Sequence, residues 1–284
     1  MGRVSESAYG DLGRPPLHET ALRRALVRDG GLWRDVRVVA ETGSTNADLA
    51  VAAREGAPEG TVLATELQTA GRGRQGRRWA APARSGLMFS ILLRPAVPVD
   101  RLGWIPLLTG VSAASAVQRM TARVEAGEFG EAHGDVAVDV RLKWPNDLLV
   151  GERKLAGILA ERVDDAVIVG VGLNVSLRED ELPVPTATSL AIEGAPLADR
   201  ATLLRAILRR FEGWYREWTE LDGDPEKSGL RTAYKELCVT LGRTVRVDLP
   251  GAETLSGVAG DVDHAGRLVV GDRAVSAGDV VHVR

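Results

Sequence analysis

Apolar residues recur along this chain with two different spacings, and the spacing separates predicted helices from predicted strands. Leu22 and Leu26 repeat at helical spacing, and the pair Gly30-Gly31 that follows them is typical of a helix end. A longer stripe of leucines and aromatic residues follows a capping Asp199, and we interpret it as a core-facing helix, not a cofactor site. The predicted helices lie at 19–28, from Asn46 through Ala53, at 104–124, from Asp199 through Trp218, and at 229–237.

Short runs that are apolar, or that alternate with charges, predict strands separated by glycine or acidic turns. Two of these runs flank a glycine-rich loop, so we expect them to pair in one sheet. The last three are joined by tight turns at Gly151 and Asp164, which predicts a meander. The predicted strands lie at 36–40, 61–67, 85–93, 136–142, 148–150, 154–163 and 166–175.

The pattern changes at Thr244, beyond which short strands alternate with Gly, Asp and Pro turns. This pattern predicts a small all-β unit, an SH3-like β-barrel. With about 45 residues, such a unit lies near the lower size limit for independent stability, so we expect it to lean on the larger domain. The predicted organisation is a disordered segment at 1–16, a larger domain at 17–236 and an SH3-like domain at 237–284.

Composition and charge limit the kind of ligand. The chain has 284 residues, 44% of them hydrophobic and 26% charged, which is ordinary for a globular protein. A net charge of −3 makes any arginine cluster a local feature and favours small anionic ligands over nucleic acid. No run of apolar residues is long enough for a membrane span, and the polar start does not resemble a signal peptide, so we expect a cytoplasmic protein. The single cysteine, Cys238, excludes an intramolecular disulfide and is expected to be a small buried hydrophobe.

The glycine-rich loop at 68–79 is the main candidate binding site. It holds three glycines and four arginines between Gly71 and Arg78. Glycines leave backbone N–H groups open to a ligand, and arginine offers a permanent charge to a phosphate or carboxylate. The spacing satisfies G-x-G-x-x-G, but a strand follows instead of the helix that a dinucleotide fold requires. A solvated basic turn between two strands is the alternative.

Other polar residues allow two interpretations each. Ser44, Thr45 and Asn46 precede a helix, where they would cap it, with Thr45 and Asp48 forming a capping box. The same side chains would also face any cleft beside that helix start. Lys143 and Lys154 stand among apolar neighbours, where a lysine either extends its ammonium to water or directs it at an anion.

Three linked motifs now suggest a family. They are Gly71-Arg-Gly-Arg-Gln-Gly-Arg77, Lys143-Trp-Pro-Asn-Asp147 and Lys154-Leu-Ala-Gly-Ile-Leu159, with Ser44-Thr-Asn46 upstream and Gly170-Val-Gly-Leu-Asn174 downstream. From about residue 36 to the C-terminus, their order and spacing closely resemble the biotin protein ligase family. The resemblance implies an α+β fold, in which a mixed sheet with packed helices, similar to class II synthetases, forms a biotin- and ATP-binding catalytic domain. It also implies the terminal SH3-like barrel.

The resemblance further implies a reaction and its residues. Biotin and ATP would give biotinyl-5′-AMP, and the acyl group would pass to a lysine of a biotin carboxyl carrier protein, with Mg²⁺ accompanying ATP. Asp147 is a weak candidate metal ligand, and the four histidines lack metal-binding spacing. The implied catalytic residues are Lys154, Arg74 and Asp147. The implied biotin-binding residues are Ser44, Thr45, Asn46, Gln68, Gly71, Arg72, Gly73, Arg74, Lys154 and Gly157. The implied ATP-binding residues are Arg72, Arg74, Trp79, Lys143, Asn146, Lys154 and Asn174.

Some features depart from the family or leave alternatives open. Only one helix is predicted ahead of the first strand, so we expect no DNA-binding domain of the kind that some relatives carry. The acidic stretch at 125–135 is expected to be a mobile surface insertion, and 178–194 a flexible loop beside the site. No adenine contact is identified, and a homodimer through a sheet edge is possible. The alternatives in function are a lipoate or octanoate ligase or transferase of the same fold, and a nucleotide- or nucleic-acid-binding regulator without chemistry.

Overall fold

A computed structural model describes residues 13–122, 138–195, 199–249 and 253–283. Its larger part is an α+β fold around one seven-stranded sheet with the order β1-β2-β3-β7-β6-β5-β4. Strands β1 and β2 are parallel, and every other neighbouring pair is antiparallel. The strands are β1 Asp35–Val39, β2 Thr61–Thr65, β3 Gly86–Leu93, β4 Val140–Lys143, β5 Asp147–Val150, β6 Arg153–Val163 and β7 Ala166–Asn174.

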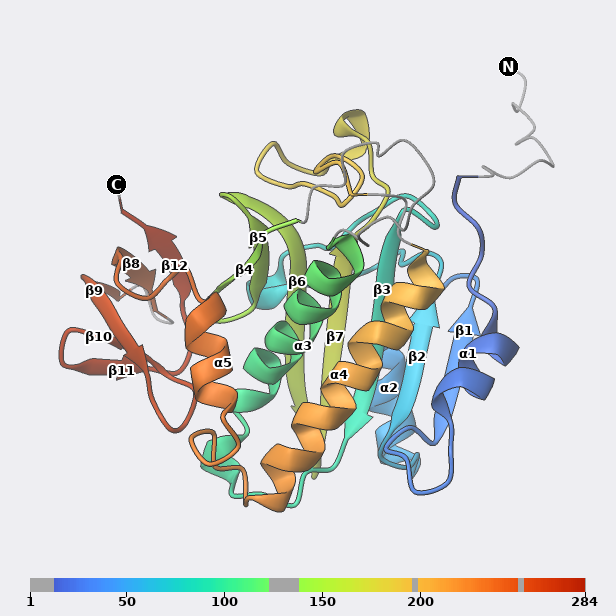
Figure 1. The fold of residues 1–284 in the computed structure, drawn as a ribbon, viewed down its shortest axis with the longest axis horizontal. Coiled ribbons are helices and arrows are strands. Elements are labelled where there is room, and N and C mark those ends of the chain that lie inside the picture. Colours follow the sequence, from blue (N-terminus) through green and yellow to red (C-terminus); the bar gives the residue numbers. More distant parts are fainter. Residues whose placement is uncertain (1–12, 123–137, 196–198, 250–252, 284) are drawn as a thin grey trace, which may run out of the picture.

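Helices cover both faces of this sheet. In Figure 1, α3 and α4 lie next to each other in front of the strands, while α2 lies behind them. Asp199 caps α4 as predicted, because its carboxylate accepts from the backbone N–H of Thr202 at 2.9 Å. The helices are α1 Glu19–Leu26, α2 Thr45–Arg54, α3 Trp104–Thr121, α4 Arg200–Glu220 and α5 Leu230–Leu237.

The meander β5-β6-β7 and the pairing of β2 with β3 confirm the corresponding predictions. Three expectations need correction or fall outside the structure. The strand expected at 136–142 is described as Val140–Lys143, and the insertion at 125–135 lies outside the described residues. The predicted disorder of 1–16 does not extend to Arg14, which is 9% exposed and donates to Ser176 O at 2.7 Å.

The C-terminal residues form a separate five-stranded antiparallel sheet with the order β11-β10-β9-β8-β12. Its strand pairs agree with the predicted all-β unit, although the pairing among the described residues is that of an open sheet, without the last pair that would close a barrel. The strands are β8 Thr244–Asp248, β9 Thr254–Val262, β10 Leu268–Val270, β11 Arg273–Val275 and β12 Asp279–His282.

This small sheet packs against the larger part of the protein, as expected. Trp104 and Trp144 are fully buried, and their indole N–H groups donate to His264 O at 2.9 Å and to Gly266 O at 3.0 Å. One hydrophobic core includes residues of both sheets, so a domain boundary near residue 237 stays a prediction. Among the helices in the described part of the chain, none is both long and apolar enough to span a bilayer.

Candidate active site

A cavity of about 890 Å³ opens where the glycine-arginine loop, β5, β6, β7 and the start of α2 meet. Every residue predicted for the site lines this cavity except Gly71. In particular, Arg72 and Arg74 from the loop share it with Lys154 from β6. Gly71 has a supporting position instead, since a Cβ there would lie 2.5 Å from Trp79 O and 2.9 Å from Gln68 Nε2.

Glycines on two neighbouring strands make the floor of the cavity accessible. A Cβ on Gly172 would lie 2.4 Å from the Trp79 ring, and a Cβ on Gly157 would lie 3.2 Å from the same ring. A Cβ on Gly170 would lie 2.2 Å from Asn46 Oδ1. Any side chain at these positions would therefore displace Trp79 or Asn46 from the sheet surface.

One end of the cavity is neutral and already hydrogen-bonded. Ser44, not Thr45, is the N-cap of α2, and its hydroxyl accepts from Ala47 N. The predicted capping box of Thr45 and Asp48 is therefore wrong, since the residue three after Ser44 is an alanine. Thr45 begins the helix, and its backbone N–H donates to Gln68 Oε1 at 2.9 Å. The Thr45 hydroxyl lies 2.6 Å from Ser90 Oγ, a buried group on β3 that the sequence analysis missed.

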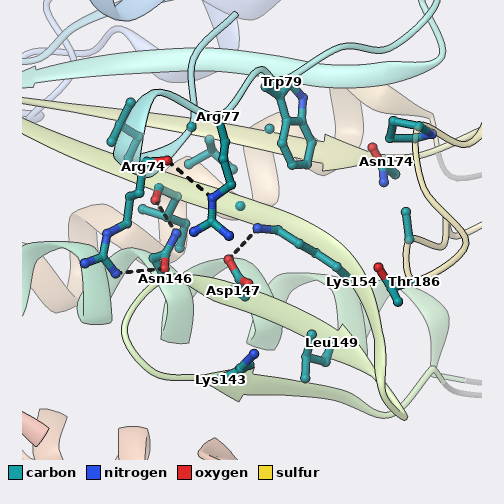
Figure 2. Close-up of a pocket in the computed structure, with 18 of the residues that line it drawn as sticks. Arg74, Arg77, Trp79, Lys143, Asn146, Asp147, Leu149, Lys154, Asn174 and Thr186 are labelled. Carbon is teal, nitrogen blue, oxygen red and sulfur yellow. Dashed lines mark hydrogen bonds and ion pairs between the residues drawn. The ribbon is translucent and has the colours of Figure 1, made fainter. Parts of the chain in front are cut away.

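The other end of the cavity is charged. Lys154 Nζ lies 2.6 Å from Asp147 Oδ1 and 5.9 Å from the centroid of the Trp79 ring. Figure 2 shows the Lys154 ammonium directed at Asp147, within the cavity that both residues line. The register of β5 on β6 places Asp147 opposite Gly157, which brings the carboxylate close to the lysine three residues earlier on β6. Of the two interpretations of Lys154, the geometry favours the one in which the ammonium faces an anion.

The arginine loop is held by polar contacts on two sides. Arg74 Nη1 donates to Asn146 Oδ1 at 3.1 Å, and Figure 2 shows its guanidinium directed at Asn146 and away from Lys154. Burial lowers the pKa of Arg74, and the Asp147 and Asp279 carboxylates oppose that shift. Arg77 donates through both terminal nitrogens to the Asp279 carboxylate, each at 3.1 Å. The loop is thus connected to the C-terminal sheet.

The C-terminal sheet also supplies part of the cavity wall, which the sequence analysis did not anticipate. Arg243 and His282 line the cavity, and the charges of Lys143 and Arg243 act on the His282 ring. Burial, followed by the charges of Lys143 and Arg243, lowers the pKa of His282 to about 4, so this imidazole is neutral near pH 7. The four histidines lack metal-binding spacing, and no sequence signal links His282 to the arginine loop, which lies about 200 residues earlier.

The segment 178–194 lies beside the site, as predicted. Its Thr186 O accepts from Lys154 N at 2.7 Å, and its Thr188 O accepts from Asn174 Nδ2 at 2.8 Å. These contacts fix the outer ends of β6 and β7. Among the described residues, no cluster of three or more His, Cys, Asp or Glu side chains could hold a metal ion.

Comparisons with known proteins decide the family. Residues 41–176 match the Biotin/lipoate A/B protein ligase family. The biotin–[acetyl-CoA-carboxylase] ligase of Mycobacterium tuberculosis is 44% identical over 277 residues, which cover 95% of this chain and 97% of that protein. This chain belongs to the biotin protein ligase family.

Other members of the biotin protein ligase family agree in sequence or in fold. The bifunctional ligase/repressor BirA of Bacillus subtilis is 30% identical over 213 residues, covering 72% of this chain and 58% of that protein. The biotin protein ligase of Aquifex aeolicus, solved in complex with biotin and ATP, superposes with a TM-score of 0.70 at 27% identity. That match covers 89% of this chain and 100% of the Aquifex chain.

Proposed function

We propose that this biotin protein ligase activates biotin with ATP as biotinyl-5′-AMP and transfers the biotinyl group to a lysine of a biotin carboxyl carrier protein. The observation that supports this most strongly is the shared cavity. Its neutral end, at Thr45 and Gln68, suits an uncharged polar ring, and its charged end, at Lys154 and the arginine loop, suits a carboxylate beside phosphates. A ligand with a polar head, a short linker and an acid would reach both ends.

In the first step, a carboxylate oxygen of biotin bonds to the α-phosphorus of ATP. The bond from that phosphorus to the oxygen bridging to the β-phosphate breaks, and pyrophosphate leaves with the electron pair. Two anions approach each other in this step, so fixed cations lower its barrier. We assign Arg72 and Arg74 to the carboxylate and the α-phosphate, and Lys154 to the charge that develops on the bridging oxygens.

In the second step, the ε-amine of the acceptor lysine bonds to the acyl carbon, and the bond from that carbon to the AMP oxygen breaks. The amine must lose a proton as it attacks. Asp147, which lines the cavity 2.6 Å from Lys154, is the carboxylate that we assign to accept that proton and to orient Lys154.

The remaining predicted residues divide between the two substrates. Ser44, Thr45, Asn46 and Gln68 are proposed to bind the ureido ring, because a buried ring with N–H and C=O groups needs both acceptors and donors. Gly71, Gly73 and Gly157 are proposed to let the backbone approach biotin. The residues proposed for the nucleotide are Trp79, Lys143, Asn146 and Asn174, together with Arg72, Arg74 and Lys154.

Mg²⁺ fits this site as a companion of ATP. Magnesium commonly binds one or two protein carboxylates together with substrate phosphates, so a cluster of acidic residues is not required. Asp147 and Glu152 both line the cavity, and Asp147 is the carboxylate that we assign to such an ion. When bound, the ion would offset charge on the phosphates.

The partner and setting follow from the relatives. The Mycobacterium tuberculosis relative is named for acetyl-CoA carboxylase, which makes the carrier domain of a biotin-dependent carboxylase the proposed acceptor. Cytoplasmic location, absence of DNA binding and a possible homodimer stay predictions. One observation argues against dimerisation through the edge strand β1. Val38 N on that strand donates to Glu19 Oε2 of α1 at 2.8 Å, so this N–H is already used within the chain.

The test is incubation of the chain with biotin, MgATP and a purified carrier domain, followed by intact mass of the carrier. We expect the mass gain of one biotinyl group, which requires both biotin and ATP. Replacing the acceptor lysine of the carrier by arginine is the matched control and should abolish the gain. A gain with lipoate and none with biotin would contradict the proposal and favour a lipoate ligase of the same fold.

A further inference from the structure

A row of hydrogen bonds leads from the neutral end of the cavity, along the sheet face that α2 covers, to the exposed residue Glu161. It runs from Thr45 through Ser90 and Asn46 to Glu161 on β6. Ser90 is fully buried, and Thr45 and Asn46 are 3% and 5% exposed, so solvent does not supply alternative hydrogen-bond partners for these three side chains. The direction in which each proton points can therefore be worked out from the acceptors alone.

The direction is set at Asn46. One end of its side-chain amide lies 3.2 Å from Leu159 O and 2.6 Å from Glu161 Oε2. A carbonyl and a carboxylate only accept hydrogen bonds, so the atom that faces both must be the amide nitrogen. The amide oxygen of Asn46 therefore faces Ser90 Oγ, at 2.6 Å.

The proton of Ser90 follows from that orientation. An amide oxygen only accepts, so the single hydroxyl proton of Ser90 is donated to Asn46 Oδ1. Ser90 Oγ then has no proton for Thr45, which lies 2.6 Å away, and Thr45 must donate to Ser90. The Thr45 hydroxyl also lies 3.2 Å from Gln68 Oε1, but its one proton is already used in the shorter contact.

The same reasoning orients Gln68. Its Oε1 accepts from the backbone N–H of Thr45 at 2.9 Å, so its Nε2 is turned the other way. Within the described part of the chain, Nε2 has no hydrogen-bond partner, and Gly71 leaves the space beside it open. The residues that line the cavity thus include Thr45, whose Oγ1 can only accept, and Gln68, whose Nε2 donates to no described group.

We propose that Ser90 and Glu161 are positioning residues that fix the Thr45 hydroxyl as a hydrogen-bond acceptor, so that the neutral end selects a ring bearing N–H beside C=O. This inference rests on the proposed function and names the chemistry by which the ring is selected. A cyclic urea offers N–H to Thr45 and C=O to Gln68. A dithiolane ring offers neither group, and a ring oxygen in place of N–H would face the Thr45 lone pairs.

The expected size of this selection follows from the cost of an unmade buried hydrogen bond. Opposing an acceptor with an acceptor in a buried site weakens binding roughly 10- to 100-fold. In Ser90→Ala the Thr45 proton loses its shorter partner. Gln68 Oε1, at 3.2 Å, remains as a weaker acceptor, so the hydroxyl can turn to donate to a ring oxygen when one is bound. Discrimination should then fall although neither Thr45 nor Gln68 has been changed.

The experiment compares biotin with its two cyclic carbamate analogues, in each of which one ring N–H is replaced by oxygen. Their KM and kcat in pyrophosphate release are measured for the wild-type chain and for Ser90→Ala. In the wild type, we expect at least one isomer to have a KM roughly 10- to 100-fold above that of biotin. In Ser90→Ala that ratio should fall to about threefold or less, with kcat for biotin changed little.

Two further variants separate positioning from a general structural effect. Ser112→Ala is the matched control, because Ser112 is also fully buried and, among the residues that the structure describes, its hydroxyl donates within α3, to Leu108 O at 2.8 Å. It should keep the wild-type ratio. Glu161→Ala should lower the ratio less than Ser90→Ala does, since Leu159 O still holds Asn46, and Glu161→Gln should restore it through an amide oxygen that accepts from Asn46.

The outcomes are distinct. An unchanged ratio in both Ser90→Ala and Glu161→Ala would overturn the inference, as would an equal fall in Ser112→Ala. Should Ser90→Ala fail to fold, the two variants of the exposed Glu161 decide the question. The inference then requires a lower ratio in Glu161→Ala and a restored ratio in Glu161→Gln. No binding of biotin by the wild-type chain would instead reject the proposed function.

Discussion

The two ends of the cavity are built on different principles. At the neutral end, Thr45 and Gln68 are held by uncharged hydrogen bonds that the protein satisfies internally and that leave defined groups facing the cavity. At the charged end, Lys154 and Arg77 are already paired with carboxylates of the protein, and their side chains are 34% and 56% exposed. The neutral end is therefore preformed for its ligand. At the charged end, an anionic ligand must compete with the carboxylates that pair with Lys154 and Arg77.

The difference has a physical cause. Neutral hydrogen bonds can be buried in advance, because each donor simply needs one acceptor. Several cations in one cavity repel each other, and burying each one costs solvation, so the carboxylates of Asp147 and Asp279 beside two of them offset part of that cost. We therefore expect the neutral end to respond to substitutions in ligand selectivity and the charged end to respond in catalysis and in salt dependence.

The largest expected effect is at Lys154. Lys154→Ala removes the cation assigned to the bridging oxygens, and we expect adenylate formation to fall about a thousandfold, as for other groups that stabilise a developing charge. Biotin binding should change much less, because the neutral end remains intact. Pyrophosphate release measures the first quantity and calorimetric titration with biotin the second.

Lys227→Ala is a suitable control for this substitution, because Lys227 is 72% exposed and its Nζ lies 3.8 Å from Asp224 Oδ2, away from the cavity. It should retain both activities. Undiminished pyrophosphate release by Lys154→Ala would remove this lysine from the mechanism. A parallel loss of biotin binding would show that the two ends of the cavity do not act separately.

Much of the charged end could be predicted from the sequence, because its residues lie in short motifs at strand ends. Lys154 and the run Lys143 to Asp147 are conspicuous as polar groups among apolar neighbours. The arginine loop is recognisable from its high content of glycine and arginine. The meander was likewise predictable, since tight turns leave few ways to connect consecutive strands, whereas the mixed sheet was implied by the resemblance to the family.

Other parts could not be predicted, for reasons that differ by residue. Ser90 is a single serine in an apolar strand, and nothing local distinguishes it from an ordinary strand residue. Arg243 and His282 reach the site only through packing between two sheets that are distant in sequence. Ser44 and Thr45 have nearly the same capping chemistry, so the sequence alone could not decide which of them begins the helix.

A smaller effect on the reaction is expected from replacing Arg74, which we assign to the carboxylate of biotin and the α-phosphate. Arg74→Gly removes a side chain that contacts Asn146 and that we assign to the carboxylate and α-phosphate. We expect the adenylate to be held roughly 10- to 100-fold more weakly, as for the loss of a hydrogen bond from a charged group. Released adenylate would then label lysines indiscriminately, which a streptavidin blot of a bystander protein measures.

Arg273→Gly controls for the loss of an arginine elsewhere, because Arg273 pairs with Glu253 on the C-terminal sheet and does not line the cavity. It should label only the carrier. Labelling of the carrier alone by Arg74→Gly would contradict the role assigned to Arg74.

The smallest expected effect is at the ion pair between Arg77 and Asp279, which connects the arginine loop to β12. Both side chains are substantially exposed, at 56% and 42%, so their coupling should amount to about 1 kcal/mol or less despite the two hydrogen bonds. A double-mutant cycle of Arg77→Ala and Asp279→Ala, read out as KM for MgATP, should therefore show a coupling of at most about fivefold.

Salt then distinguishes the two ends of the cavity. At about 1 M NaCl the coupling between Arg77 and Asp279 should disappear, because exposed charges are screened over a few ångströms. The discrimination between biotin and its carbamate analogues depends mainly on the buried neutral groups of Thr45, Ser90 and Asn46. It should change little with salt, since Leu159 O holds Asn46 beside the exposed Glu161 carboxylate. A cycle on Arg273 and Glu253, a pair of similar exposure away from the cavity, should show no coupling in KM at any salt concentration. If the Arg77 coupling persisted at high salt, the loop would be held to the C-terminal sheet by packing, and the charged end would be as preformed as the neutral one.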